Sequence, residues 1–191
     1  MTTQEASVPT SGKRVLIGAS GAASAMMLPM YINALHAQLG GTFTVLRAHT
    51  AATFIPPHTL EPVADRVVSG DSSSDWAAEN QARLVAEHDI LVVLAATANT
   101  LANAAAGAAP NRLLAVILAS NFPVVFFPVM NGNMWNKPAV KRNVAQLRED
   151  GYHVNDPVWA DRYDVGSRTI LHDPTLPPPP EVAQVIAKLM P

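Results

Sequence analysis

Short apolar runs alternate with helix-forming segments along most of this chain, and this alternation constrains the fold more than any other feature. Each run ends in small or turn-forming residues, as a buried parallel strand does before a helix. The predicted strands cover residues 14–18, 42–48, 90–95 and 122–129, and the predicted helices end near residue 38 or cover residues 76–88, 99–107 and 135–149. Strands and helices in alternation form a parallel sheet covered by helices, so we predict an α/β fold.

The length of 191 residues suits one domain around one core. We expect a disordered tail over residues 1–12, which are small and polar, and a single domain over residues 13–191. Pro29 lies inside the first helix and predicts a kink or a late helix start. Residues 156–180 are rich in Pro, Asp and Arg without a clean period, which indicates an irregular flap, and residues 181–190 are predicted to form a closing helix.

The amino-acid composition limits which molecules this protein can bind and which catalytic groups it can use. Hydrophobic residues make up 49% of the chain and charged residues only 15%, which leaves little charge to cover a monomer, so we expect a homo-oligomer. A net charge of −2 provides no basic surface for nucleic acid. The absence of cysteine excludes a disulfide, a thiolate metal site and a protein thiol nucleophile, and we predict no other metal site. Without a secretion signal or a run of about 18 apolar residues, the protein is expected in the cytoplasm and not in a membrane.

The first of three notable loops, Gly18–Ala25, lies where a strand meets a helix. Its small residues let an anion approach backbone N–H groups at the positive end of the helix, which suits a cofactor phosphate. Small residues also simply permit close packing of the strand on the helix. The loop lacks the lysine ending of a P-loop and the full dinucleotide glycine pattern, so both interpretations stay open.

The second loop, Ala95–Thr100, follows an apolar strand at its carboxyl end, where open α/β sheets place their ligands. The hydroxyl and carboxamide groups of Thr97, Asn99 and Thr100 can hydrogen-bond a polar heteroaromatic ring. The simpler interpretation is that Thr97 or Asn99 caps the following helix. Both interpretations predict polar groups at the end of this strand.

The third loop, Pro128–Trp135, places two carboxamides and two thioethers in one turn after a strand. An amide N–H₂ group there can bind a carboxylate without adding charge. The simpler interpretation makes Asn131 a helix cap and makes Met134 and Trp135 core residues. Taken singly, each of the three loops is weak evidence for a site.

Together, the loops resemble those of the homo-oligomeric flavin-containing cysteine decarboxylases, a family that includes phosphopantothenoylcysteine decarboxylase and the peptidyl-cysteine decarboxylases of lantibiotic-like peptide biosynthesis. Ala95–Thr100 is similar to the family's Pro-Ala-Ser-Ala-Asn-Thr loop, and Pro128–Trp135 matches its Pro-x-Met-Asn-x-x-Met-Trp motif. The similarity extends over residues 14–154, including Thr50–Phe54 after the second strand. It implies a flavodoxin-like (Rossmann-like) three-layer sandwich, trimers that sometimes assemble into dodecamers, and a bound flavin, usually FMN, with FAD as the alternative.

The resemblance also implies roles for individual residues. The residues around the flavin phosphate would be Ser20, Gly21, Ala22 and Ala23, with Thr50 and Phe54 nearby, and the rest of the flavin site would be lined by Thr97, Ala98, Asn99, Thr100 and Val129. Relatives often have a serine where this chain has Ala22, so Ser20 or Ser24 would supply that hydroxyl. Asn131 would bind the carboxylate or amide of the substrate cysteine, and Met134 would shape the pocket beside the flavin.

One departure from the family pattern concerns the catalytic base. Relatives place a catalytic histidine eight residues before an Asp that corresponds to Asp89, and this chain has Gln81 at that position. The nearest histidines in sequence are His58 and His88, and each is a candidate replacement. Without a base, a thiol of pKa about 8.5 is still a few per cent thiolate at neutral pH, so a slow enzyme remains feasible.

A second departure is the flap, which lacks the cysteine with which phosphopantothenoylcysteine decarboxylases return electrons to their product. Arg162, Tyr163 and Arg168 of the flap either grip a peptide or are solvated loop residues. We therefore predict oxidative decarboxylation of the C-terminal cysteine of a precursor peptide to an aminoenethiol. The alternatives are a catalytically impaired flavin-binding regulatory or scaffold protein, which Gln81 favours, and a phosphopantothenoylcysteine decarboxylase-like enzyme.

Overall fold

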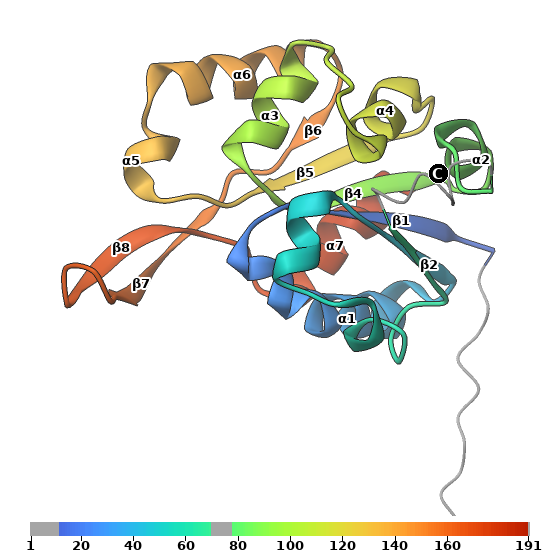
Figure 1. Cartoon of the computed structure of the whole chain (residues 1–191), viewed down its shortest axis with the longest axis horizontal. Helices are drawn as coiled ribbons and strands as arrows, with labels where there is room; N and C mark the ends of the chain where they lie inside the picture. Colours follow the sequence, from blue (N-terminus) through green and yellow to red (C-terminus); the bar gives the residue numbers. More distant parts are fainter. Residues whose placement is uncertain (1–11, 70–77, 191) are drawn as a thin grey trace, which may run out of the picture.

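A computed structural model describes residues 12–69 and 78–190. Its centre is a six-stranded parallel sheet with the order β3-β2-β1-β4-β5-β6 (Figure 1). The strands are β1 (Arg14–Ala19), β2 (Thr42–Arg47), β3 (Arg66–Ser69), β4 (Ile90–Ala96), β5 (Val124–Pro128) and β6 (His153–Val154). The strand order reverses between β1 and β4, and open sheets of this kind bind ligands beside that reversal, at the carboxyl ends of the strands.

Helices cover both faces of the sheet, as Figure 1 shows. The helices are α1 (Leu28–Leu39), α2 (Gln81–Ala86), α3 (Ala98–Ala105), α4 (Arg112–Ala119), α5 (Gly132–Trp135), α6 (Pro138–Glu149) and α7 (Pro179–Leu189), with 3-10 turns η1 (Ala23–Met27), η2 (His49–Thr53) and η3 (Pro57–Thr59). Helices α1 and α7 share one buried cluster with Val15 and Ile17 of β1, whereas α2, α3, α4 and α6 share the other with Leu16. This three-layer arrangement confirms the predicted flavodoxin-like (Rossmann-like) α/β fold.

Several elements differ in detail from the sequence prediction. Pro29 is the second residue of α1, directly after η1, so it marks a late helix start and not a kink. The predicted helix over residues 135–149 divides into α5 and α6, because Pro138 begins a new helix. The strands β3 and β6 were missed because four and two residues are too few to display a period. Residues 1–11 of the expected tail and residues 76 and 77 of a predicted helix lie outside the described residues.

The segment predicted to be an irregular flap contains an antiparallel hairpin of β7 (Val158–Asp164) and β8 (Thr169–Thr175). In Figure 1 this hairpin projects beyond α5 at the carboxyl edge of the main sheet. Most residues of β7 are exposed on both faces of the hairpin. The prediction of irregular structure is wrong because a hairpin with two exposed faces has no alternation of apolar and polar residues to reveal it.

No helix within residues 12–69 and 78–190 is long and apolar enough to cross a membrane. In the same part of the chain, no group of three or more His, Asp or Glu side chains is placed to hold a metal ion. The cytoplasmic location expected from the sequence stays a prediction.

Candidate active site

Turns that close four neighbouring strands line one pocket at the carboxyl edge of the sheet, beside the reversal of strand order. Its volume is about 420 Å³. The lining residues are Ser20 and Gly21 after β1, Ala48 and Thr50 after β2, Thr97, Ala98, Asn99 and Thr100 after β4, Met134 after β5, and Asn111, Leu113 and Leu114 at the start of α4. Eight of these were predicted to be site residues, namely Ser20, Gly21, Thr50, Thr97, Ala98, Asn99, Thr100 and Met134.

Ser20 holds the turn after β1 against the turn after β4. Its side chain is 2% exposed, and its hydroxyl donates to the carbonyl oxygen of Ala95. The same hydroxyl accepts the backbone N–H of Thr97 at 3.2 Å. Because its only proton is engaged within the protein, this hydroxyl is a poor donor to a phosphate, and Ser24 becomes the better candidate for that contact.

The turn after β4 has a strained backbone. Ala95 has a φ of 68°, in the left-handed region that residues with a side chain rarely occupy. The register between β4 and β5 shifts beside it, between Leu94 and Ala96. The carbonyl of Ala96 then accepts the N–H of Val129 at 3.0 Å, which joins the turns after β4 and β5. Strain that the surroundings hold in place is typical of ligand sites.

Gly18 within β1 and Gly21 in the turn after it allow close packing that a side chain would prevent. A Cβ at Gly21 would lie 2.2 Å from Oγ1 of Thr50 and 2.4 Å from its Cβ. A Cβ at Gly18 would lie 2.5 Å from Cδ1 of Leu113 in α4. The interpretation that small residues let the strand pack closely on a helix is therefore confirmed for Gly18, whereas Gly21 packs against the turn after β2. Gly21 also borders the pocket, so its backbone is open to a ligand.

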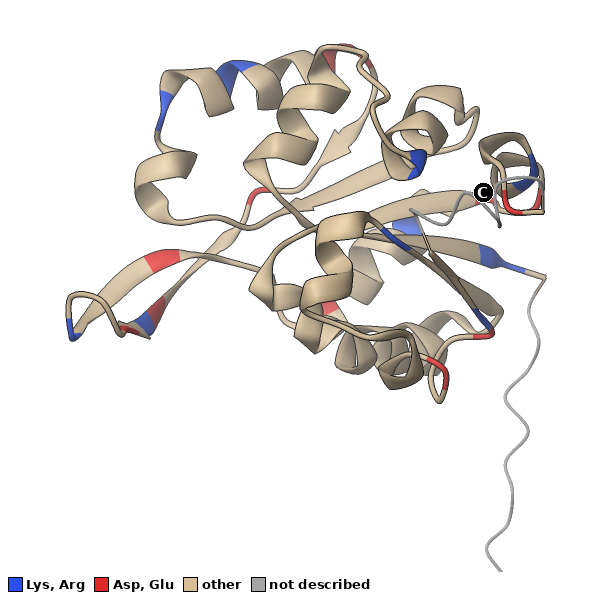
Figure 2. Cartoon of the chain, viewed as in Figure 1, with Lys and Arg blue, Asp and Glu red and all other residues tan. Residues whose placement is uncertain are grey.

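The helix α3 begins at the pocket with a polar cap. Thr97 Oγ1 accepts the N–H of Thr100 at 3.2 Å and lies 3.0 Å from the hydroxyl of Thr100. The capping interpretation of the second loop is thus confirmed, and both threonines nevertheless line the pocket. The lining contains no charged side chain. Figure 2 shows Lys, Arg, Asp and Glu scattered over many other segments of the chain. A ligand there would meet hydroxyl, carboxamide and backbone groups.

The third loop places Met134 at the pocket and Trp135 in the core. Asn131 caps α5, since its Oδ1 accepts the N–H of Met134 at 2.9 Å. Trp135 is 4% exposed and belongs to the core, whereas Met134 is 42% exposed and lines the pocket. The simpler interpretation is therefore right for Asn131 and Trp135 and wrong for Met134. Because the cap engages Oδ1, the N–H₂ group of Asn131 is the end of the amide that points away from the helix.

Asn131 itself, the three flap residues and five further predicted residues lie outside the pocket lining. Ala22 and Ala23 stand at the start of η1, and Phe54 and Val129 are half-buried. Ala22, Phe54 and Val129 pack against the core. Gln81 is the first residue of α2, and its Oε1 is buried without a hydrogen-bond partner in the described part of the chain. An amide does not accept a thiol proton at neutral pH, so Gln81 cannot act as the missing base.

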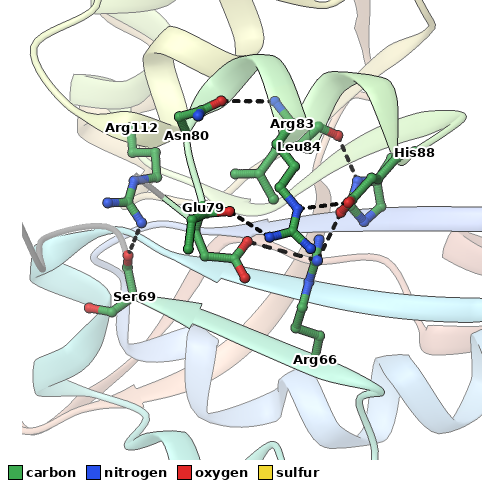
Figure 3. A network of polar contacts seen from close by, with 10 residues as sticks. Arg66, Ser69, Glu79, Asn80, Arg83, Leu84, His88 and Arg112 are labelled. Atoms are coloured by element: carbon green, nitrogen blue, oxygen red, sulfur yellow. Dashed lines mark hydrogen bonds and ion pairs between the residues drawn. The ribbon is translucent and has the colours of Figure 1, made fainter. Parts of the chain in front are cut away.

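Neither histidine considered as a replacement base lines the pocket. His88 precedes β4, so the length of that strand separates it from the site by about 20 Å. Its Nδ1 bonds the carbonyl of Leu84 at 2.7 Å, and burial lowers its pKa. Figure 3 shows its ring beside the polar contacts of Arg66 and Arg83. The structure contradicts the hypothesis for His88 and places His58 on the exposed turn η3.

The three flap residues have different surroundings on the hairpin. The Arg162 Nη2 atom lies 2.6 Å from Oδ2 of Asp173, so this guanidinium is engaged within the hairpin. Tyr163 is 59% exposed. Arg168 lies in the turn between the strands with a φ of 57°. Asp173, which the sequence analysis missed, also accepts the N–H of Gly132 at 2.8 Å.

Four further lining residues were missed, namely Ala48, Asn111, Leu113 and Leu114. Asn111 caps α4, since its side chain accepts the N–H of Leu114 at 3.0 Å. An Asn directly before an apolar run is a signature of a helix start, so this signal was present in the sequence. No comparable local signal marks Ala48.

Similarity to known proteins extends over most of the chain. The family model described as flavoprotein matches residues 3–172. Mersacidin decarboxylase of Bacillus sp. (strain HIL-Y85/54728) is 32% identical over 157 residues, which cover 82% of this chain and 80% of that protein.

Solved structures show the same likeness. The FMN-dependent cysteine decarboxylase SpaF is 32% identical, with a TM-score of 0.75 over 93% of this chain and 97% of that one. A variant of the peptidyl-cysteine decarboxylase EpiD, complexed with the substrate peptide DSYTC, has a TM-score of 0.82 at 23% identity, which is a likeness of fold, over 93% of this chain and 99% of that one. The family match over most of the chain, with the identity to mersacidin decarboxylase, shows that this chain belongs to the flavoprotein family.

Proposed function

We propose that this protein is an FMN-dependent peptidyl-cysteine decarboxylase that converts the C-terminal cysteine of a precursor peptide to an aminoenethiol. One observation carries the proposal: the turns after β1, β2, β4 and β5 line a single uncharged pocket, to which the turn of Asn131 contributes Met134. The activities named for mersacidin decarboxylase and SpaF support the same chemistry.

The pocket fits a flavin. Its volume of about 420 Å³ is in the range of cofactor sites. Thr97, Asn99 and Thr100 offer polar groups to the ring, and the backbone at Gly21 is open to a phosphate. FMN, when bound, supplies the two-electron acceptor for oxidation at Cβ of the substrate cysteine. Release of the flavin by denaturation and chromatography distinguishes FMN from FAD.

Asn131 binds the carboxylate of the substrate cysteine in this proposal. Its cap to Met134 fixes the amide so that Nδ2 donates outward. A neutral donor suits a group that departs as CO₂, because an ion pair with arginine would stabilise the carboxylate before its loss. Met134, which lines the pocket, packs beside the reacting carbons.

No protein base deprotonates the thiol in this proposal, since Gln81 is an amide and His88 lies at the far edge of the sheet. The substrate then reacts as its own thiolate, whose population rises with pH up to the thiol pKa of about 8.5. We expect kcat/KM to increase with pH until about that value. A bell-shaped profile centred below pH 7 would instead indicate a protein base.

The hairpin grips the peptide residues that precede the cysteine. Trp159 and Tyr163 are separated by an even number of positions along β7, so their side chains lie on the same face of the hairpin. Ile170 pairs with Tyr163 across the hairpin and shares that face. These three side chains are 41%, 59% and 63% exposed. The peptide named in the EpiD complex ends in cysteine, which supports a peptide substrate here.

The protein assembles as a homo-oligomer, and the expected state is a trimer or a dodecamer built from trimers. Met26, Met27 and Met30 are neighbours in η1 and α1, and they are 60%, 42% and 58% exposed. Burial of such side chains against a second copy removes apolar surface from water. Light scattering of the purified protein measures the number of subunits, and a monomer would contradict this part of the proposal.

Mass spectrometry tests the activity on a peptide that ends in free cysteine. The expected product has lost CO₂ and two hydrogens, and a matched peptide with a C-terminal carboxamide should not react. A protein that binds flavin but leaves the free peptide unchanged would be the regulatory or scaffold protein that Gln81 favours. A colourless protein that takes up no flavin would refute both.

A further inference from the structure

Asp173 is a buried carboxylate outside the pocket lining, and it joins two parts of the molecule. It lies on β8 and is 8% exposed. Its Oδ1 accepts the N–H of Gly132, the first residue of α5, at 2.8 Å. Its Oδ2 accepts Nε of Arg162 from β7 at 2.8 Å. These bonds hold the pKa of Asp173 below its usual range, with the N–H of Gly132 as the larger cause.

The packing around Gly132 shows how close this contact is. A Cβ at Gly132 would lie 3.0 Å from Oδ1 of Asp173 and 3.2 Å from the ring of Trp159. The hairpin therefore meets α5 through a carboxylate and an aromatic ring, and both would have to move by a few tenths of an ångström to admit a Cβ at this position. Gly132 directly follows Asn131, so the contact adjoins the proposed carboxylate-binding amide.

Helix α5 has four residues, too few to be stable alone. Its cap satisfies the N–H of Met134 from within the turn, whereas the N–H of Gly132 is satisfied only across 41 residues of sequence, by Asp173. The direction of the Asn131 turn thus depends on a bond to the hairpin. Arg162 in turn holds the carboxylate, which orients Oδ1 toward Gly132.

We propose that Asp173 is a positioning residue for the decarboxylation, because it latches the β7–β8 hairpin onto the turn of Asn131. This one contact fixes the position of the hairpin face that carries Trp159 and Tyr163 relative to the amide of Asn131. This inference rests on the proposed function for its catalytic meaning. Arg162 is then the support of the latch, and its charge is not available to the peptide.

Two variants of Asp173 separate the latch from simple packing. Asp173→Asn keeps an oxygen for the N–H of Gly132 but loses the charge that holds Arg162, whereas Asp173→Ala loses both. We expect KM for the peptide to rise at least about tenfold in the Ala variant, with a fall in kcat, and a smaller rise in KM for the Asn variant with kcat nearly retained. Flavin affinity should be unchanged in both. Asp156→Ala is the matched control, since Asp156 precedes the hairpin and its carboxylate pairs with Arg148 at the surface.

Hydrogen exchange at the Gly132 amide provides a measurement that does not require activity. Exchange should be slow in the wild type and in Asp156→Ala, and at least about tenfold faster in Asp173→Ala. Unchanged exchange, or unchanged kcat and KM in an active enzyme, would overturn the latch. If the wild-type protein binds flavin but converts no peptide, the proposed function fails, and the exchange rates still decide whether the latch exists.

Discussion

The turns at the carboxyl edge of the sheet and the β7–β8 hairpin are held in opposite ways. The turns bond to one another, as Ser20 does to Ala95 and Thr97, and as Val129 does to Ala96. They carry no charge and rest on two buried clusters. The hairpin is exposed along most of its length and bears several charges, as Figure 2 shows.

This difference indicates that the pocket is preformed, whereas the position of the hairpin can adjust. Turns that the core holds in a strained conformation keep their geometry without a ligand. A two-stranded hairpin is marginally stable by itself, so its position depends on its few anchors. We infer that the cofactor site is rigid and that substrate binding depends on how the hairpin is attached. The following four predictions test that contrast, in order of decreasing effect.

The largest expected effect is on the turn where the two regions meet. Asn131→Asp keeps the helix cap, because Asp caps as well as Asn, but replaces the amide donor by a carboxylate that repels the substrate. We expect kcat/KM to fall about 100-fold or more, with an unchanged melting temperature and unchanged flavin content. Steady-state kinetics with a cysteine-ending peptide measures this. A variant as active as the wild type would show that Asn131 serves only as a cap.

A smaller loss is expected from a change confined to the rigid pocket. Gly21→Ala places a methyl group 2.2 Å from the hydroxyl of Thr50, which costs about 1–3 kcal/mol. We expect flavin affinity to fall about 10–100-fold while Gly132 amide exchange stays slow. The double variant Gly21→Ala with Thr50→Gly removes the clashing side chain and should recover affinity relative to Gly21→Ala. If Gly21→Ala binds flavin normally, the pocket is not rigid.

The hairpin should respond to acid before the pocket does. The N–H of Gly132 and the guanidinium of Arg162 lower the pKa of Asp173. A carboxyl group whose pKa is lower in the folded state stabilises the fold above its unfolded pKa, about 3.9, and this contribution is lost as pH falls through the folded value. The NMR shift of the Gly132 amide should therefore be constant from pH 7 to about 4 and change below that. The change should be absent in Asp173→Asn, and its persistence there would assign it to another group.

The smallest effect is a gain in stability from relief of strain. Ala95→Gly relieves the strain of an alanine in the left-handed conformation, which destabilises the fold by about 1–2 kcal/mol. The glycine also adds entropy to the unfolded chain, which opposes this gain by about 0.4–1 kcal/mol. We expect the free energy of unfolding to rise by roughly 0.5 kcal/mol in denaturant titrations. Ala19→Gly, at the end of β1 without positive φ, should instead lower it by about 0.5–1 kcal/mol. Equal losses in both variants would argue against strain at Ala95.

Local patterns in the sequence determined the α/β layers and the existence of three ligand-facing loops. Apolar runs mark β1, β4 and β5, because a strand buried on both faces is apolar throughout. Thr97 and Asn131 were predictable as caps, since a cap needs only residues within one turn. Asn111 carries the same signal, directly before the largely apolar helix α4, which the sequence analysis did not predict.

Only the tertiary structure decided which of these groups meet. Ser20 bonds the carbonyl of Ala95, 75 positions away, and Asp173 bonds Gly132, 41 positions away. The hairpin could not be predicted because its exposed faces have no periodic pattern, and His88 was misjudged because nearness in sequence ignores the length of β4. The physical reason is the same in each case. Periodicity and capping depend on neighbours along the chain, whereas contacts between strand ends depend on the order of the strands in the folded sheet.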